Sequence, residues 1–305
     1  MKKISIIIPF YNEKENLPRI YDELSKAVHL VTDYQFEILL MDNHSNDGSE
    51  GVALSLCQND NRLKYFRQSR NFGYQINILS GYLQCSGHAA IQLDADGEDD
   101  PLLIKEFISS WEKGYKVVYG VRKKRVENIF VSFQRKVFYR LLRSLSEVDI
   151  PVDAGDFRLV DRQVIEALRG FKESTPYIRG LLSYAGFSQL GIPYERRSRY
   201  SGESKFSWWD YCVMAWGAIT SFSKAPLVLI GWIGFFLCAT SFILGLGYLA
   251  MFLLDRIVVQ GFTTLILIFL FFSGVNLLCL GILATYVGRV FDEVKARPRQ
   301  FWEKL

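Results

Sequence analysis

Histidine and cysteine, two residues that often build metal or disulfide sites, are scarce in this chain. Its 305 residues include three histidines and five cysteines. The histidines lack the spacing of metal ligands, no two cysteines form a C-x-x-C pair, and the number of cysteines is odd. We therefore expect neither a zinc site nor a disulfide framework, and the composition fits a reducing compartment.

A strong excess of one charge is also missing. The formal net charge is +4, with 36 Lys and Arg against 32 Asp and Glu, so no broad basic field predicts a nucleic-acid partner. A signal peptide is not predicted either. The opening stretch, MKKISIIIPFYNE, has two lysines and an apolar run, but that run ends by Phe10 without a small-residue cleavage site. We expect this stretch to form the first strand.

Charged residues are absent from two long runs in the last third of the sequence. Residues 227–254 and 262–288 contain no Asp, Glu, Lys or Arg, and each run exceeds the roughly 20 residues that cross a hydrocarbon core. A buried core helix is the alternative for such a run. Two runs joined by a short link favour a transmembrane hairpin over residues 225–288, in a multi-pass integral protein of the lipid bilayer.

The charges beside these runs predict how the hairpin is oriented. Residues 122–143 contain eight basic residues and one acid, and residues 289–305 contain five basic residues and three acids. Short segments rich in lysine and arginine stay in the cytoplasm. We therefore expect the N-terminal domain, both termini and a basic tail over residues 289–305 on the cytoplasmic side of the cytoplasmic membrane.

Three further patterns concern the membrane. Residues 128–145 combine an apolar stripe with basic residues, which is typical of an amphipathic helix at the membrane surface, although an ordinary surface helix has the same pattern. Residues 206–224 are rich in tryptophan and tyrosine, as aromatic belts are, and predict a juxtamembrane helix. Gly274, Gly281 and Gly288 recur every seven residues, which allows close packing within the hairpin or in a homo-oligomer.

Residues 1–120 alternate short apolar runs with amphipathic stretches. One such stretch places Leu17, Ile20, Leu24 and Val28 on one helical face. The alternation predicts an α/β fold with a mostly parallel sheet that is covered on both faces. Polar segments follow the first four predicted strands, namely PFYNEKEN, MDNHSNDGS, SRNFGYQ and DADGED. Because ligands bind beyond the carboxyl ends of parallel strands, we expect these segments to converge on one site.

The fourth polar segment, within IQLDADGEDDP, gathers carboxylates that resist joint ionisation unless a cation neutralises them. Asp94 and Asp96 would share one face of an extended strand, and Glu98 would follow on the turn. Hard oxygen ligands select Mg²⁺, Mn²⁺ or Ca²⁺, and Mg²⁺ usually binds substrate phosphates as well. The alternative is a solvated acidic turn before the next helix, which we expect Asp99 and Asp100 to cap.

Six segments follow one another along the chain: IIIPFYNEKENL, MDNHSNDGS, SRNFGYQ, LDADGEDDP, GDFRLVDR and RRSRYSGESKFS. The resemblance that they carry covers about residues 3–290. In this order and spacing they resemble glycosyltransferase family 2, the inverting GT-A class. Within it the chain is similar to the polyprenyl-phosphate glycosyltransferases, the group of dolichol-phosphate mannose synthases and undecaprenyl-phosphate (bactoprenol) glucosyltransferases. The resemblance implies a Rossmann-like GT-A catalytic domain over residues 1–205, followed by the C-terminal two-helix transmembrane hairpin.

The resemblance also implies a role for each matching residue. Asp94, Asp96 and Asp156 would be catalytic. Asp94 and Asp96 would hold a divalent metal, Mg²⁺ or Mn²⁺, with Glu98 as the third ligand. The donor nucleotide and its phosphates would be bound by Pro9, Tyr11, Glu13, Asp42, Asp94, Arg196 and Lys205. The phosphate of the lipid acceptor would be bound by Arg122, Arg135, Arg199 and Ser204. For Asp156 the alternative is a plain salt bridge to Arg158.

Two positions depart from the family pattern. Asp42-Asn43-His44-Ser45 stands where the family usually has Asp-Asp-Gly-Ser. Asn43 can form hydrogen bonds but carries no charge, which leaves the identity of the nucleotide base open. Glu98 stands where glutamine is often found, and its added charge should tighten metal binding.

The resemblance implies transfer of one sugar from a nucleotide sugar, with UDP-glucose favoured, to a polyprenyl phosphate such as undecaprenyl phosphate. The product would be a lipid-linked sugar for glycosylation of the cell envelope. A phosphate monoester has its second pKa near about 6, so Asp156 would orient the acceptor more than deprotonate it. Alternative donors are GDP-mannose, UDP-GlcNAc and UDP-galactose.

Two other functions fit the same fold. A processive polysaccharide synthase should carry a Q-x-x-R-W segment and more spans, and the sequence has neither. A non-catalytic membrane scaffold would not need the acidic and basic residues of the motifs, yet Asp94, Asp96, Asp156 and Lys205 are all present. We therefore expect an enzyme.

Overall fold

The computed structural model describes residues 1–122, 154–197, 225–254, 262–298 and 300–303. They belong to two compact units. An α/β unit contains the first two of these ranges together with residues 296–298 and 300–303, and a helical unit contains residues 225–254 and 262–295.

The described residues of the α/β unit form one sheet of seven strands in the order β3-β2-β1-β4-β6-β5-β7. All neighbouring strands run parallel except where β6 pairs with β4 and β5. The strands are β1 (Lys2–Phe10), β2 (Tyr34–Asp42), β3 (Leu63–Arg67), β4 (Ala89–Gln92), β5 (Val117–Arg122), β6 (Ala154–Asp161) and β7 (Gln189–Tyr194). The predicted α/β class with a mostly parallel sheet is confirmed.

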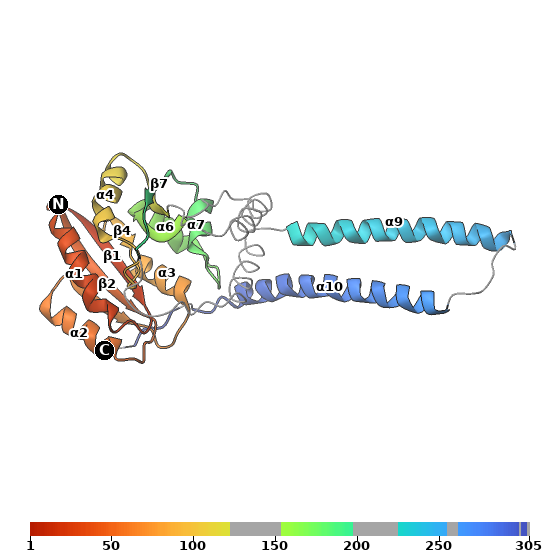
Figure 1. The fold of residues 1–305 in the computed structure, drawn as a ribbon, viewed down its shortest axis with the longest axis horizontal. Coiled ribbons are helices and arrows are strands. Elements are labelled where there is room, and N and C mark those ends of the chain that lie inside the picture. Colours follow the sequence, from red (N-terminus) through yellow and green to blue (C-terminus); the bar gives the residue numbers. More distant parts are fainter. Residues whose placement is uncertain (123–153, 198–224, 255–261, 299, 304–305) are drawn as a thin grey trace. The chain divides into compact units, whose positions relative to one another are not determined.

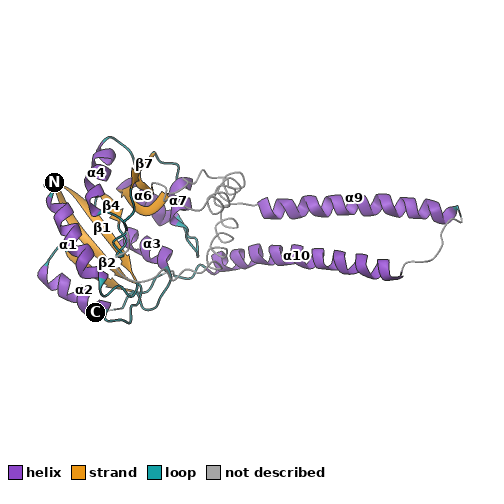
Figure 2. Ribbon diagram, viewed as in Figure 1, coloured by secondary structure: helices purple, strands orange, loops and turns teal. Residues whose placement is uncertain are grey.

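Helices cover both faces of this sheet (Figures 1 and 2). They are α1 (Asn16–His29), α2 (Ser49–Asn59), α3 (Tyr74–Gln84), the short 3-10 helix η1 (Pro101–Leu103), α4 (Ile104–Glu112), α6 (Arg162–Gly170) and α7 (Ile178–Tyr184). The predicted apolar face of α1, formed by Leu17, Ile20, Leu24 and Val28, is buried. It packs in one core with α4 and with alternate residues of β1.

The opposite face of β1 packs against α3 at very short range. A Cβ atom added at Gly81 would lie 2.3 Å from Cγ2 of Ile7, which is fully buried. Because both faces of β1 are covered, its second half, IIIPF, is a continuous apolar run instead of an alternating one.

Replacing Gly81 by alanine is therefore expected to destabilise the protein by about 1–3 kcal/mol, since overpacking a filled core forces side chains and backbone apart. Thermal unfolding of the purified full chain would measure this loss. Gly51→Ala is the matched control: it lies in α2 with nothing within 4 Å of the added Cβ, and better helix propensity should leave it neutral or more stable. A melting temperature for Gly81→Ala equal to that of the control would refute the close packing.

The helical unit consists of α9 (Ala225–Leu253) and α10 (Phe262–Lys295), which contact each other and lie side by side in Figure 1. Both are long and apolar enough to cross a membrane, with candidate spans at Pro226–Leu244 and Phe271–Lys295. The start of α10 agrees with the predicted run over residues 262–288. Its end differs, because residues 289–295, predicted as the start of the tail, continue the helix to Lys295.

Candidate active site

The carboxyl ends of β1 and β2 are joined by hydrogen bonds between the loops that follow them. The Asn12 amide donates to Ser45 Oγ (2.9 Å), the Glu13 amide donates to Ser49 Oγ (3.1 Å), and the Asn46 amide donates to Asn12 Oδ1 (2.9 Å). Two of the four predicted polar segments therefore form one connected surface at this edge of the sheet.

The third polar segment is held to the second by Asn43. Its Oδ1 accepts from the Phe72 amide (3.0 Å), and its Nδ2 donates to Asn71 Oδ1 (2.8 Å). Asn71 Oδ1 also accepts from the Gly73 amide (2.9 Å). A carboxylate at position 43 would have no donor for Asn71. The departure from the usual Asp-Asp pair therefore has a structural use in this chain.

Four of the seven residues expected to bind the donor nucleotide and its phosphates lie on or directly after β1 and β2, namely Pro9, Tyr11, Glu13 and Asp42. Their roles stay predictions. Pro9 and Asp42 are buried, and Asp42 accepts hydrogen bonds from the Ser45 amide, Ser45 Oγ and the Tyr65 hydroxyl. Glu13 accepts from Asn16 Nδ2 (2.6 Å). Tyr11 is 37% exposed, which makes it the most accessible of the four.

The fourth polar segment follows β4, and its acids accept hydrogen bonds from different partners. Asp94 Oδ1 accepts from the Tyr74 hydroxyl (2.6 Å) and from Gln92 Nε2 (3.0 Å). Asp96 is 8% exposed, and its Oδ1 accepts from the Glu98 amide (3.1 Å) across a turn at Gly97, whose φ is 75°.

Of the two acids predicted to cap the next helix, only Asp100 does so: its carboxylate accepts from the Leu102 amide (3.0 Å). The prediction for Asp99 is wrong. Asp99 is 1% exposed and accepts a hydrogen bond from the Tyr194 hydroxyl at the end of β7. Its side chain therefore faces into the fold, toward the same edge of the sheet as Asp94.

The antiparallel direction of β6 brings Asp156 to this edge. Gln92, the last residue of β4, pairs with Arg158 of β6, and Asp156 lies close enough to Asp94 for the two charges to interact. Asp156 accepts two hydrogen bonds from Arg179 on α7, both 2.8 Å long. Arg158 Nη2 lies 3.4 Å from Asp156 Oδ1. Both the predicted alternative partner and a second arginine therefore contact Asp156.

These two acids have opposite electrostatic surroundings. Burial, followed by the charges of Asp99, Asp96 and Asp156, raises the pKa of Asp94 to about 7. Burial also acts to raise the pKa of Asp156, but the arginines around it, with Arg179 first, hold that pKa below its ordinary value. Asp156 is therefore ionised at neutral pH, whereas Asp94 is partly protonated there.

Predicted phosphate-binding arginines lie beside these acids. Arg122, the last residue of β5, contacts Tyr194 and lies close enough to Asp99 for the two charges to interact. Arg196, which follows β7, forms an ion pair with Glu98. The predicted third metal ligand is thus paired with a predicted diphosphate-binding residue. In the part of the chain that the structure describes, no three His, Cys, Asp or Glu side chains are arranged as metal ligands.

Comparison with known proteins decides the family. A family model described as glycosyl transferase family 2 matches residues 5–169. The chain is 39% identical to the uncharacterized glycosyltransferase YkcC of Bacillus subtilis, over 98% of this chain and 93% of that protein. It is 33% identical to the SfII prophage-derived bactoprenol glucosyl transferase of Shigella flexneri, over 99% and 98%. The chain belongs to glycosyltransferase family 2.

This family 2 enzyme also shares its fold with a solved structure. A crystal structure of a mycobacterial protein matches with a TM-score of 0.50 and 14% identity, over 72% of this chain and 73% of that one. Family membership and the mostly parallel sheet together confirm the predicted GT-A fold.

Several predicted parts of this family 2 glycosyltransferase lie outside the described residues. They are Arg135, Arg199, Ser204, Lys205, the surface helix over residues 128–145 and the juxtamembrane helix over residues 206–224. Three residues of the site were not singled out from the sequence. Tyr74 lies inside the quoted segment SRNFGYQ, whereas Arg179 and Tyr194 lie in stretches without a motif.

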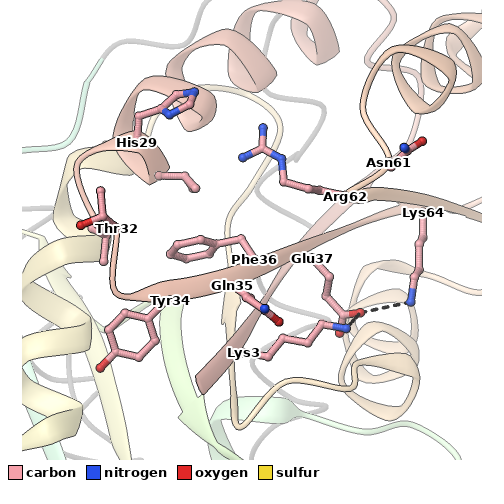
Figure 3. Close-up of a pocket in the computed structure, with 12 residues that line it drawn as sticks. Lys3, His29, Thr32, Tyr34, Gln35, Phe36, Glu37, Asn61, Arg62 and Lys64 are labelled. Atoms are coloured by element: carbon pink, nitrogen blue, oxygen red, sulfur yellow. Dashed lines mark hydrogen bonds and ion pairs between the residues drawn. The ribbon is translucent and has the colours of Figure 1, made fainter. Parts of the chain in front are cut away.

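A cavity of about 590 Å³ opens at the opposite edge of the sheet, where β1, β2 and β3 begin (Figure 3). Its single acidic side chain, Glu37, is paired with two lysines. Glu37 is 4% exposed and lies 2.7 Å from Lys3 Nζ and 3.2 Å from Lys64 Nζ. Burial acts to raise the pKa of Glu37, but hydrogen bonds from Lys3, Ser5 and Ser86 lower it to about 2. These contacts stabilise the fold and offer no unpaired acid for catalysis.

Glu37→Gln should therefore change how stability depends on pH. The folded-state pKa of Glu37 lies below its unfolded value, so its contribution is complete above about pH 4.5 and is lost as the pH falls toward 2. We expect a loss of on the order of 2–3 kcal/mol in the variant at pH 7, and a difference from wild type that narrows below pH 4.5. Melting temperatures between pH 3 and 7 would measure it, with exposed Glu106→Gln as control. A difference that widens on acidification would refute the assignment.

Proposed function

We propose that this enzyme transfers one glucose from UDP-glucose to the phosphate of undecaprenyl phosphate. The main support for this proposal is that two acids with different surroundings lie at the carboxyl ends of the parallel strands. Asp94 has no cationic partner among the described residues, whereas Asp156 is paired with Arg179 and Arg158. The prophage-derived bactoprenol glucosyl transferase of Shigella flexneri, similar over nearly the whole chain, supports a glucosyl group and a bactoprenol-type acceptor.

The donor is expected to bind at the carboxyl ends of β1 and β4. From β1 the chain adds β2 and β3 on one side of the sheet and then β4 on the other side, so the order of strands reverses between β1 and β4. Ligands of open parallel sheets occupy the crevice at such a switch point. The loops joined through Asn12, Asn43 and Ser45 would receive the nucleoside on the β2 side. Asp94 and Asp96, directly after β4, would then face the diphosphate.

The donor set at this edge fits a divalent cation such as Mg²⁺ or Mn²⁺. Asp94 and Asp96 supply hard carboxylate oxygens, and Asp94 receives hydrogen bonds only from neutral groups within the described chain. Two carboxylates together with substrate phosphates are a usual site for Mg²⁺. When bound there, the cation would stabilise the negative charge of the departing diphosphate. The involvement of Glu98, now paired with Arg196, stays a prediction.

Asp156 and its arginines would act on the acceptor. A phosphate monoester is largely dianionic at neutral pH, so it needs orientation and charge compensation more than a general base. Arg179 and the buried Arg158 would hold Asp156 ionised, and the partly exposed guanidinium of Arg179 is suited to phosphate. The acceptor phosphate oxygen would bond to the anomeric carbon as the bond to the donor diphosphate breaks. UDP then leaves, and this single displacement inverts the anomeric centre.

The helical unit would place the reaction at the bilayer. Apolar side chains of α9 and α10, including Phe235, Phe236 and Leu277, are exposed in the structure, so a protein interior does not account for them. Such an exposed apolar surface is expected to be buried in the hydrocarbon core of a lipid bilayer. Basic flanking segments would then keep the catalytic unit and both termini in the cytoplasm. The glycines of α10 would allow close packing between spans or between copies of the chain.

A donor panel tests this proposal. Membranes containing the full chain would be incubated with Mg²⁺ or Mn²⁺, undecaprenyl phosphate and one of four labelled donors: UDP-glucose, UDP-GlcNAc, UDP-galactose or GDP-mannose. We expect label to enter the organic phase with the lipid, mostly from UDP-glucose. Label from another donor would change the sugar assignment, and no lipid-linked label from any donor would refute the transfer. Wild-type activity in Asp96→Asn would remove the metal assignment.

A further inference from the structure

Residues 300–303 lie against the end of β3, the edge strand of the sheet. Trp302 forms an antiparallel bridge with Gln68. The Ser69 amide donates to the Phe301 carbonyl (2.9 Å), and the Glu303 amide donates to the Arg67 carbonyl (3.0 Å). The segment therefore pairs with the backbone that follows β3, at the same edge of the sheet as the candidate active site.

Aromatic contacts fix the segment in place. The Trp302 ring packs edge-on against Phe66, with centroids 5.6 Å apart, and Phe301 stacks on Phe72 at 6.1 Å. Phe72 belongs to the loop that Asn43 holds through the Phe72 amide. Phe66 precedes and Phe72 follows Gln68 in the chain, so the adjacent residues Phe301 and Trp302 pack against both flanks of the bridge.

Glu303 links this segment to the loop after β2. Its Oε2 lies 3.1 Å from Arg67 Nε, and its Oε1 lies 3.5 Å from His44 Nδ1. Arg67 also donates through Nη2 to the Ser45 carbonyl (3.2 Å) and forms an ion pair with Glu50. The Glu303 carboxylate thus lies beside His44, which is part of the 42–45 loop, and beside Arg67, which donates to the backbone of that loop at Ser45.

The 42–45 loop contains a backbone conformation that needs support. His44 has φ 66°, a left-handed conformation that costs a non-glycine residue free energy and persists only where its surroundings hold it. The His44 ring lies 3.2 Å from the Gln68 carbonyl as well as next to Glu303. The residues that hold this conformation are therefore those that contact the 300–303 segment.

We propose that residues 300–303 are a positioning element for the 42–45 loop and set the affinity for the nucleotide part of the donor. This inference rests on the proposed function, because it takes that loop as the nucleoside-binding side of the site. Glu303 and Trp302 act through His44, Arg67 and Phe66 and need not touch the donor. Loss of their contacts frees the loop to leave its strained conformation, so each binding event must restore it.

The test separates donor binding from the other steps of the reaction. The purified full chain and the variants Trp302→Ala and Glu303→Gln would be assayed with varied UDP-glucose at saturating undecaprenyl phosphate, and then the reverse. We expect the donor KM to rise about fivefold in each variant, the effect of roughly 1 kcal/mol, while kcat and the acceptor KM change less than about twofold. Trp302→Phe and Glu303→Asp should restore most of the donor affinity.

Glu106→Gln is the matched control, because it removes one exposed acid from α4, away from the segment. A donor KM that stays at the wild-type value in both variants would overturn the proposal. So would a uniform loss of kcat, both KM values and melting temperature, since that pattern indicates general destabilisation. Calorimetric titration with UDP and GDP tests the same point without the lipid: equal Kd values for wild type and variants overturn the positioning role even if no transfer occurs.

Discussion

Replacing Asp94 by asparagine is expected to abolish most of the transfer activity and, at the same time, to stabilise the metal-free protein. The asparagine Oδ1 can still accept from Tyr74 and Gln92, so the local geometry is kept. The variant loses a carboxylate that we assign to the diphosphate and its cation. Removing such a group commonly lowers the rate by about 10²–10³-fold.

The gain in stability follows from the pKa of Asp94. Its folded value of about 7 lies above its ordinary value of 3.8, so the wild type loses stability between these two pH values, where the unfolded chain ionises Asp94 and the folded protein keeps it protonated. Asparagine has no such cost. Melting temperatures in EDTA at pH 5 and pH 8 should show a larger advantage of the variant at pH 8. Asp22→Asn, an exposed change on α1, is the control. An active variant, or one that melts lower at pH 8, contradicts this account of Asp94.

Replacing Arg179 by glutamine is expected to lower kcat/KM by about 10²-fold and to shift its pH dependence. Arg179 is the largest of the charges that hold the pKa of Asp156 down. Without it, the buried carboxylate keeps, among the described residues, only the more distant Arg158 as a hydrogen-bonding partner, and its pKa must rise. The acidic limb of the kcat/KM profile should therefore move to higher pH.

The pH–rate profile distinguishes this role from simple loss of folding, because destabilisation alone lowers the rate without moving the limb. Arg179→Lys should keep the charge but not the two parallel hydrogen bonds, and should recover only part of the activity. Arg169→Gln, on α6 in a half-exposed pair with Glu166, should behave as wild type. An unshifted profile in Arg179→Gln would remove Arg179 from the account.

The sequence predicts the four polar strand ends well because a parallel sheet places them at one edge whatever the details of packing. Asp100 also follows from local rules, since an acid before a proline-initiated helix is a common cap. Asp99 does not: its partner, Tyr194, is 95 residues away, and only the assembled sheet brings β7 next to the turn after β4.

The position of Asp156 shows a second limit. Its motif marks it as chemically important, but the direction of β6 is not visible in the sequence, and that direction decides which end of the strand lies beside Asp94. Arg179 is hidden for the same reason. It lies on α7 without any motif, and its role depends on how α7 packs near the start of β6.

The His44 position and the 300–303 segment illustrate a third limit. His44 stands where the family usually has glycine, and the sequence of the loop alone does not show what supports it. In the structure it is a residue in a left-handed conformation, supported by Gln68 and Glu303. Long-range contacts of this kind carry no local sequence signal.

The most direct test of the central claim uses purified full chain, UDP-glucose and Mg²⁺ with two lipids, undecaprenyl phosphate and undecaprenol. Both released UDP and lipid-linked glucose would be measured over time. We predict equal amounts of the two products with undecaprenyl phosphate, with the glucose inverted at its anomeric carbon, and neither product with undecaprenol. Glucose transferred equally well to undecaprenol, or UDP released without any lipid-linked glucose, would contradict transfer to a lipid phosphate.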